Sequence, residues 1–182
     1  MTDRATFPVE IAGVKRDLRL FEVKPGLKIA ILNILGDTEL VEVAADELLK
    51  KLGDGYEAFV TAESKSIPLA YALSAKSKKP YIVLRKEYKP YMGDALQAET
   101  LSITTGKPQK LYLDEKDRAL IEGKRVVIVD DVISTGSTLE GMRLLMEQAA
   151  AEIKAEAAIF TEGDADQWEK IVSLGHLPVF VE

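Results

Sequence analysis

The segment VVIVDDVISTGST, residues 126–138, constrains this chain more than any other segment. Val126 to Val129 form an unbroken apolar run, which is typical of a parallel strand covered on both faces. Ligands of such sheets gather at the carboxyl ends of the strands, and Asp130 and Asp131 follow the run directly. The pattern therefore predicts a ligand site with two carboxylates where this strand ends.

Small and hydroxylated residues then lead into an amphipathic helix. They are Ser134, Thr135, Gly136, Ser137 and Thr138. Hydroxyls and unobstructed backbone N–H groups donate to phosphate, and the positive end of a helix favours an anion. The chain has no GxxxxGK[ST], and the spacing of Gly136 and Gly141 does not make GxGxxG. The turn therefore predicts a phosphate cradle of another kind, suited to a phosphorylated sugar.

At these residues the chain resembles the type I phosphoribosyltransferases, whose signature is an apolar strand, an acidic pair and a T-G-x-T type loop. The resemblance implies that Asp130 and Asp131 hold the ribose hydroxyls of phosphoribosyl pyrophosphate (PRPP). It also implies that the 5′-phosphate is held by Thr135, Gly136, Ser137 and Thr138, with Ser134 nearby. The chemistry agrees, because carboxylates accept hydrogen bonds from diols whereas the loop donates them.

A second loop, TAESKS at residues 61–66, follows the predicted strand EAFVT and precedes a helix that begins near Pro68. In the family the corresponding turn binds pyrophosphate and often contains a cis non-proline peptide. The resemblance implies PRPP contacts from Glu63, Ser64, Lys65 and Ser66, with Lys65 as an electrostatic clamp. The alternative is that Lys65 is a solvated loop lysine and Glu63 an acid at the start of a helix.

A third element is the basic pair Arg85 and Lys86 at the end of the predicted strand YIVL. Purine phosphoribosyltransferases have a similar R-K pair, followed by a mobile loop that closes over the reaction centre. The resemblance implies that both residues bind PRPP and that residues 87–108 form the flexible loop. The alternative is that the pair only contributes surface charge that keeps the protein soluble.

The resemblance implies transfer of the 5-phosphoribosyl group from PRPP to a ring nitrogen, with release of pyrophosphate. We expect Lys65, Arg85, Asp130 and Asp131 to be the catalytic residues. The expected cofactor is Mg²⁺, held through PRPP, and we assign it no direct protein ligand. Charge develops on the leaving pyrophosphate and on the sugar, where cations and carboxylates respectively stabilise it.

The acceptor base is predicted from the tail, residues 156–182, which resembles bacterial adenine and xanthine phosphoribosyltransferases. That resemblance implies a purine base contacted by Glu162. Xanthine-specific relatives often have a lysine directly after this glutamate, and here the position is Gly163. The departure favours adenine, and thus a role in purine salvage.

The composition agrees with one compact α/β domain. The chain has 182 residues, of which 47% are hydrophobic and 30% charged. The absence of cysteine excludes disulfides and thiolate metal sites, and the single His176 is assigned no role. A net charge of −6 and a pI near 5.0 argue against nucleic-acid binding. With no apolar segment for a signal peptide or membrane span, we expect a cytoplasmic protein, and the family implies a homodimer.

The apolar patterns predict a doubly wound parallel sheet, preceded by an irregular first third. Leu40, Ala44, Leu48 and Leu52 predict a helix over 38–52 that Gly53 ends. The other predicted helices lie near 67–77, 137–151 and 165–173, and the predicted strands are 57–61, 81–84, 125–130, 156–161 and 178–181. Residues 99–113 predict a projecting hairpin joined at Gly106. We expect residues 1–36 to contribute to a hood and residues 37–182 to form the core of one domain, 1–182.

Two other functions stay open at this point. One is a non-catalytic PRPP-sensing regulator on the same fold, because some purine-operon repressors share this core, including the SITTG stretch at 102–106. Such repressors usually add an N-terminal DNA-binding domain, for which the residues before 37 are too few. The other is a phosphoribosyltransferase for another base: xanthine, guanine, hypoxanthine or a pyrimidine.

Overall fold

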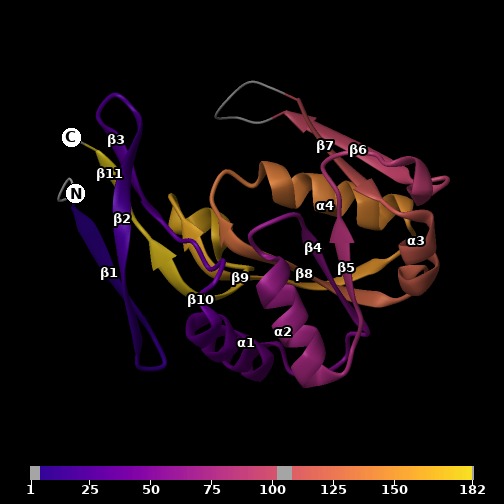
Figure 1. Cartoon of the computed structure of the whole chain (residues 1–182), viewed down its shortest axis with the longest axis horizontal. Helices are drawn as coiled ribbons and strands as arrows, with labels where there is room; N and C mark the ends of the chain where they lie inside the picture. The colour runs from indigo at the N-terminus through magenta and orange to yellow at the C-terminus, as the bar shows by residue number, and fades with distance from the viewer. Residues whose placement is uncertain (1–4, 102–107, 182) are drawn as a thin grey trace.

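The structure, a computed structural model, describes residues 5–101 and 108–181. Its centre is a five-stranded parallel sheet in the order β10-β9-β8-β4-β5 (Figure 1). The strands are β4 Ala58–Ala62, β5 Tyr81–Leu84, β8 Arg125–Ile133, β9 Glu152–Glu162 and β10 Val172–Leu177. The predicted α/β class with a parallel sheet is confirmed.

Helices cover both faces of this sheet. Helices α1 (Thr38–Leu52) and α2 (Ile67–Ser77) pack on one face, and α4 (Ser137–Gln148) packs on the other (Figure 1). The short helix α3 (Glu115–Ile121) leads into β8. Alternate residues of β8 face the two layers: Val127 and Val129 point toward α1 and α2, whereas Val126 and Ile128 point toward α4. This double burial explains why the apolar run in β8 has no polar interruption.

Helix α1 forms where the apolar spacing predicts it. Leu40, Ala44 and Leu48 are buried on one face. The Asp37 side chain caps the first turn by accepting a hydrogen bond from the Leu40 N–H, and the helix ends at Gly53. Arg16 also binds the Asp37 carboxylate, at 2.7 Å from Nε to Oδ2, and so ties the N-terminal sheet to the core.

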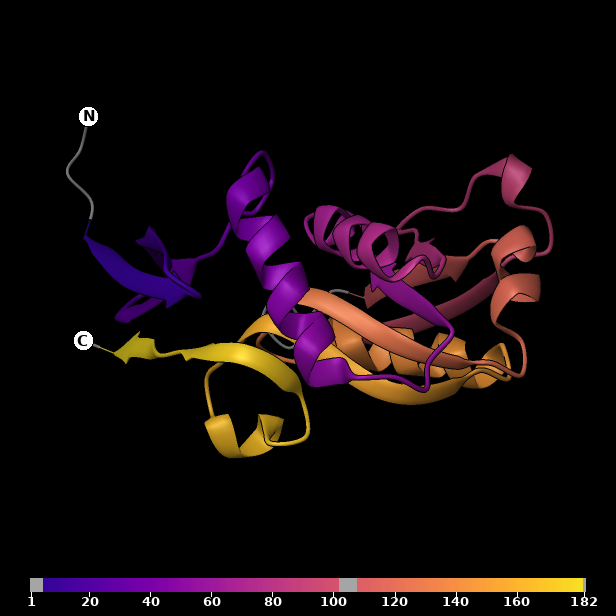
Figure 2. The same ribbon diagram turned by 90° about the horizontal axis from the view of Figure 1, so that it is seen from below.

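The N-terminal residues form a second, antiparallel sheet at one end of the molecule (Figure 2). Its order is β1-β2-β3-β11, with β1 Thr6–Ile11, β2 Val14–Lys24, β3 Leu27–Ile31 and β11 Val179–Val181. The expectation of an irregular first third was therefore wrong. The predicted strand 178–181 exists, but it pairs with β3 rather than joining the parallel sheet. We call this four-stranded sheet the hood.

The predicted hairpin over 99–113 is confirmed as the antiparallel pair β6 (Leu96–Leu101) and β7 (Pro108–Leu113). It packs against α4, and the Thr100 hydroxyl donates to the Ser137 carbonyl at 3.1 Å. Gly106, the predicted turn, lies outside the described residues. Before the hairpin, residues Pro90–Met92 form the short 3₁₀ helix η1.

The predicted helix near 165–173 was wrong. Only Ala165–Trp168 is helical, as the 3₁₀ helix η2, and Asp164 caps it by accepting from the Asp166 N–H at 3.2 Å. Strand β10 follows and pairs in parallel with β9 along the edge of the sheet. From Val172 onward the backbone therefore makes sheet hydrogen bonds with β9 instead of continuing a helix.

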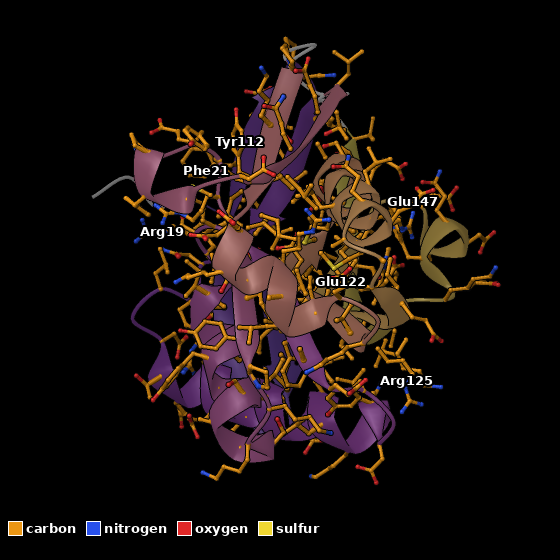
Figure 3. All side chains as sticks on the ribbon, turned by 90° about the vertical axis from the view of Figure 1, so that its right-hand side faces the viewer. Arg19, Phe21, Tyr112, Glu122, Arg125 and Glu147 are labelled. Atoms are coloured by element: carbon orange, nitrogen blue, oxygen red, sulfur yellow. The ribbon has the colours of Figure 1, made fainter. Side chains whose placement is uncertain are left out.

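The amino-terminal edge of the parallel sheet lies beside α3. Figure 3 views the molecule from this side, with Glu122 and Arg125 labelled where α3 ends and β8 begins. The Arg125 N–H donates to Glu57 at this edge, so β4 and β8 start together. Across the described ranges, no helix has the length and apolar character needed to span a bilayer.

Candidate functional site

A cavity of about 330 Å³ lies at the carboxyl ends of β4 and β8. It brings together parts of the three segments that the sequence singled out: the loop after β4, Lys86 of the basic pair after β5, and the acidic pair in β8. The lining residues are Ala62, Glu63, Ser64, Lys65, Ser66, Lys86, Asp130, Asp131, Val132 and Thr138. Strand ends of a parallel sheet are where ligands of this architecture bind.

The predicted phosphate loop surrounds a smaller hollow of about 40 Å³, next to this cavity. Gly136 has a φ of +78° and precedes α4, and its carbonyl accepts from the Glu140 N–H at 2.8 Å. A left-handed conformation of this kind favours glycine. The Thr135 and Ser137 hydroxyls lie 3.2 Å apart beside it. The loop thus presents hydroxyls at the first turn of a helix, the arrangement that suits an anion.

The two acids differ in burial. Asp131 is buried, whereas Asp130 is half-buried and accepts from the Asp131 N–H at 2.8 Å. Burial, and then the neighbouring Asp131 carboxylate, raise the pKa of Asp130 well above its usual range. Ionising both carboxylates is therefore energetically unfavourable. A cation or a hydrogen-bond donor beside the pair would stabilise the ionised form.

Lys65 is the cation nearest to the pair. Its Nζ lies 3.0 Å from Asp131 Oδ2 and donates to the Leu32 carbonyl at 3.3 Å. The peptide bond between Glu63 and Ser64 is cis, so the loop has the isomer that the family often shows and the sequence did not decide. Through its contacts with Asp131 and the Leu32 carbonyl, Lys65 connects the loop after β4 with β8 and with the segment that follows β3.

Glu63 and Arg85 pair with each other. Arg85 Nε donates to Glu63 Oε2 at 2.8 Å, and the Lys86 backbone N–H donates to Glu63 Oε1. Hydrogen bonding to Glu63 raises the pKa of Arg85 further, so its charge is permanent. The cavity lining contains Lys86 and does not contain Arg85. The geometry makes Arg85 a support for Glu63, while its predicted contact with PRPP stays a prediction.

The Ser66 side chain points inward. Ser66 is buried, and its hydroxyl lies 2.7 Å from Thr61 Oγ1 and 3.1 Å from the Ala62 carbonyl. Thr61 Oγ1 in turn donates to the Val129 carbonyl at 2.8 Å. Sequence reasoning missed Thr61, although a hydroxyl in an otherwise apolar strand was a signal. Thr61 links the loop after β4 to the residue before Asp130.

Glu162 ends β9 and is buried, but it is outside the lining of the 330 Å³ cavity. Burial raises the pKa of its carboxyl group, and the nearby Lys65 lowers it to a smaller extent. His176, to which the sequence assigned no role, donates from Nε2 to the Gly163 carbonyl at 3.1 Å, and its Nδ1 lies 2.9 Å from Thr161 Oγ1. His176 therefore fixes the turn that follows Glu162.

The donor set suits Mg²⁺ that arrives with a phosphorylated ligand. In the part of the chain that the structure describes, no three His, Cys, Asp or Glu side chains gather as a metal cage. Mg²⁺ usually takes one or two carboxylates and completes its shell with substrate phosphates and water. Asp130 and Asp131 supply such hard oxygen ligands in the cavity. The residues present therefore fit an ion held mainly by the ligand.

This parallel sheet, with an acidic pair, a glycine turn before a helix and lysines at its carboxyl edge, defines an α/β protein built around one strand-end site. The chain belongs to the phosphoribosyltransferase family, because the phosphoribosyl transferase domain matches residues 31–176. The five-stranded sheet and its flanking helices have the type I form of that fold.

Curated relatives include hypoxanthine/guanine phosphoribosyltransferases of archaea. The protein of Methanococcus voltae is 32% identical over 127 residues, which are 70% of this chain and 64% of that protein. The protein of Methanocaldococcus vulcanius is 33% identical over 132 residues, 71% of this chain and 68% of that protein. The match thus spans less than two thirds of the Methanococcus voltae protein.

Among solved structures, the adenine phosphoribosyltransferase of Thermoanaerobacter pseudethanolicus has a TM-score of 0.68. The superposition covers 94% of this chain and 95% of that one, at 20% sequence identity. At this identity the likeness concerns the fold, including the hood as well as the core.

Proposed function

We propose that this protein transfers the 5-phosphoribosyl group from PRPP to a purine base. The products are a nucleoside monophosphate and pyrophosphate. The observation that carries the proposal is the cavity in which Lys65, Lys86, Asp130 and Asp131 meet beside the Gly136 loop. One molecule with a 5′-phosphate, a diol and a pyrophosphate has complementary groups for all three parts of this arrangement.

The loop at 134–138 holds the 5′-phosphate, and the acidic pair accepts hydrogen bonds from the ribose 2′ and 3′ hydroxyls. Burial deprives the Asp130 carboxylate of hydrating water and so raises its pKa. The two hydroxyls of the ribose would donate hydrogen bonds in place of that water and stabilise the ionised pair. The same carboxylates favour the positive charge that develops on the sugar ring as the bond to pyrophosphate breaks.

The leaving pyrophosphate meets cations. Lys65 and Lys86 line the cavity and carry charge toward the phosphate oxygens. When bound, Mg²⁺ supplies further positive charge to the pyrophosphate and ribose oxygens. The C1′–O bond to pyrophosphate breaks as the C1′–N bond to the base forms, and the proton of the base nitrogen passes to water. No protein nucleophile is needed, so positioning and electrostatics supply most of the rate.

Lys65 is bound to Asp131 and to the Leu32 carbonyl. We infer that PRPP takes over part of the contact to Lys65, since the pyrophosphate carries more charge than one carboxylate. The Ser66 hydroxyl, which is bonded to Thr61, shapes the loop, and the exposed part of the loop makes the phosphate contacts.

The base is the finer part of the proposal. Gly163, in place of the lysine of xanthine-specific relatives, favours adenine. The relatives that are about one third identical are named for hypoxanthine and guanine, and this observation favours a 6-oxopurine as the second candidate. We propose that the acceptor is a purine, either adenine or a 6-oxopurine, and that it binds between the hood and the turn after Glu162. The predicted homodimer, lid and cytoplasmic location stay predictions.

The test is a panel of nucleobases with PRPP and Mg²⁺, followed through pyrophosphate release. Adenine, hypoxanthine, guanine, xanthine, uracil and orotate cover the alternatives. We expect turnover with at least one purine and none with the pyrimidines. Binding of PRPP without turnover on any base would contradict the transferase and favour a PRPP-sensing regulator.

A further inference from the structure

The outer edge of the Trp168 indole ring lies against Gly136. An added Cβ at Gly136 would be 2.8 Å from the Cη2 atom of the ring and 3.6 Å from its Cζ3 atom. A side chain at position 136 would collide with the ring. The ring can therefore come this close only because residue 136 is a glycine. The ring itself is half-buried and packs against the apolar cluster between α4 and the sheet.

The position of the ring is set from the other side of the site. Trp168 Nε1 donates to the Glu162 carbonyl at 3.1 Å, at the end of β9. The Ile171 N–H donates to the Trp168 carbonyl at 2.9 Å, and Asp164 caps the short helix η2 that carries the ring. These contacts fix the orientation of the indole ring relative to the end of β9.

The Gly136 turn is held on its α4 side, where the Gly136 and Ser137 carbonyls accept from the Glu140 N–H and the Thr100 hydroxyl. Gly136 begins α4 without a side-chain cap, and the Thr135 and Ser137 hydroxyls lie next to each other. A phosphate cradle depends on backbone N–H groups that already point at the ligand, because ordering them at the moment of binding costs affinity. A rigid aromatic side chain that packs on the turn reduces that cost.

We propose that Trp168 is a positioning residue that holds the Gly136 turn in its phosphate-binding conformation and joins it to the strand end at Glu162. The inference rests on the proposed function, since it assigns the turn to the 5′-phosphate of the donor. It also implies that the 5′-phosphate and the base side of the site affect each other, because one side chain contacts both.

Three variants separate this role from general stability. Trp168→Ala removes the ring, whereas Trp168→Phe keeps a shorter aromatic side chain that lacks both the outer ring atoms next to Gly136 and the Nε1 donor. Tyr56→Ala is the control. Tyr56 precedes β4, is buried and packs on the Phe59 ring, and it lies away from the strand ends that form the cavity. Thermal unfolding of each variant measures the loss of stability on its own.

The measurement is calorimetric binding of two probes that divide the donor: ribose 5-phosphate and Mg²⁺-pyrophosphate. A turn that must be ordered when the ligand binds loses affinity, so we expect Trp168→Ala to weaken the binding of ribose 5-phosphate by about tenfold or more. Pyrophosphate affinity should stay within about twofold of the parent. Trp168→Phe should recover little of the lost affinity for ribose 5-phosphate, because its shorter ring does not reach Gly136. Tyr56→Ala should bind both probes as the parent does.

Trp168 is also the only tryptophan in the chain, so its emission reports on this contact alone. Ribose 5-phosphate should change the emission of the parent protein, and pyrophosphate should change it much less. A folded Trp168→Ala that binds ribose 5-phosphate as tightly as the parent would overturn the positioning role and leave the proposed function intact. A parent protein that binds neither PRPP nor ribose 5-phosphate would overturn both.

Discussion

Lys65 Nζ lies 3.0 Å from Asp131 Oδ2 and so joins the loop after β4 to the acidic pair in β8. The two partners differ in exposure: the Lys65 side chain is 48% exposed and the Asp131 side chain 7%. The lysine can therefore move toward a ligand while the carboxylate stays in place. This pair connects the part of the site proposed for pyrophosphate with the part proposed for ribose.

Lys65→Ala should lower the single-turnover rate by on the order of 10²–10³, because a charge that stabilises the leaving pyrophosphate is lost. Rapid-quench measurement of pyrophosphate at saturating PRPP gives this rate directly. Lys116→Ala, an exposed lysine on α3, is the charge-matched control and should leave the rate unchanged. A Lys65→Ala rate equal to that of the parent would remove the clamp from the mechanism.

The contribution of Asp130 to the stability of the protein should fall as pH rises from about 4 to about 8. The reason is that burial and Asp131 raise the pKa of Asp130 from 3.8 to about 8 in the folded state. The folded protein then binds more protons than the unfolded chain across this window, and ionising Asp130 works against folding. Thermal melts of the parent and of Asp130→Asn across this range measure the effect.

Asp130→Asn should be the more stable of the two at pH 8 and about equal to the parent at pH 4. A gain of about 1 kcal/mol would raise the Tm by roughly 2–4 °C in a domain of this size. A difference in Tm that does not change with pH would show that Asp130 titrates normally.

Gly136→Ala should damage the site more than Gly123→Ala does. Both glycines have a positive φ, +78° and +70°, so each substitution carries a similar backbone cost of about 1–2 kcal/mol. The added Cβ meets Trp168 at position 136 and open space at position 123. Calorimetric titration with ribose 5-phosphate should show weaker binding only for Gly136→Ala. Equal binding by both variants would mean that the turn tolerates a displaced indole.

Thr61→Val should destabilise the protein by about 1–3 kcal/mol, because the buried Val129 carbonyl and the Ser66 hydroxyl lose their shared partner. Urea unfolding gives the difference in free energy. Thr61→Ser keeps the hydroxyl and should recover most of the loss. If Thr61→Val unfolds at the same urea concentration as the parent, this network contributes no stability.

The sequence predicted the parallel core and the position of the acidic pair and the Gly136 turn at its strand ends, because those features depend on local pattern. The apolar run of β8, the acidic pair and the small-residue turn all lie in one segment, and each property is visible residue by residue. The spacing of α1 and its Asp37 cap were equally local.

The features that the sequence did not predict depend on partners far away in the chain. Strand β11 is as apolar as a core strand, and only the three-dimensional structure shows that it pairs with β3. Strand β10 follows a polar stretch and contains Gly175 and His176, so its pattern resembled a loop. The contact between Trp168 and Gly136 joins residues 32 positions apart, and neither sequence position indicates it.

We propose that one PRPP molecule binds with its ribose on the acidic pair and its phosphates on the two loops. Calorimetric titration with PRPP and Mg²⁺, on the parent and on the double variant Asp130→Asn with Asp131→Asn, tests it most directly. We predict that the parent binds and that the folded double variant loses at least about tenfold in affinity, or roughly 1.4 kcal/mol. A folded double variant with the affinity of the parent would contradict the account.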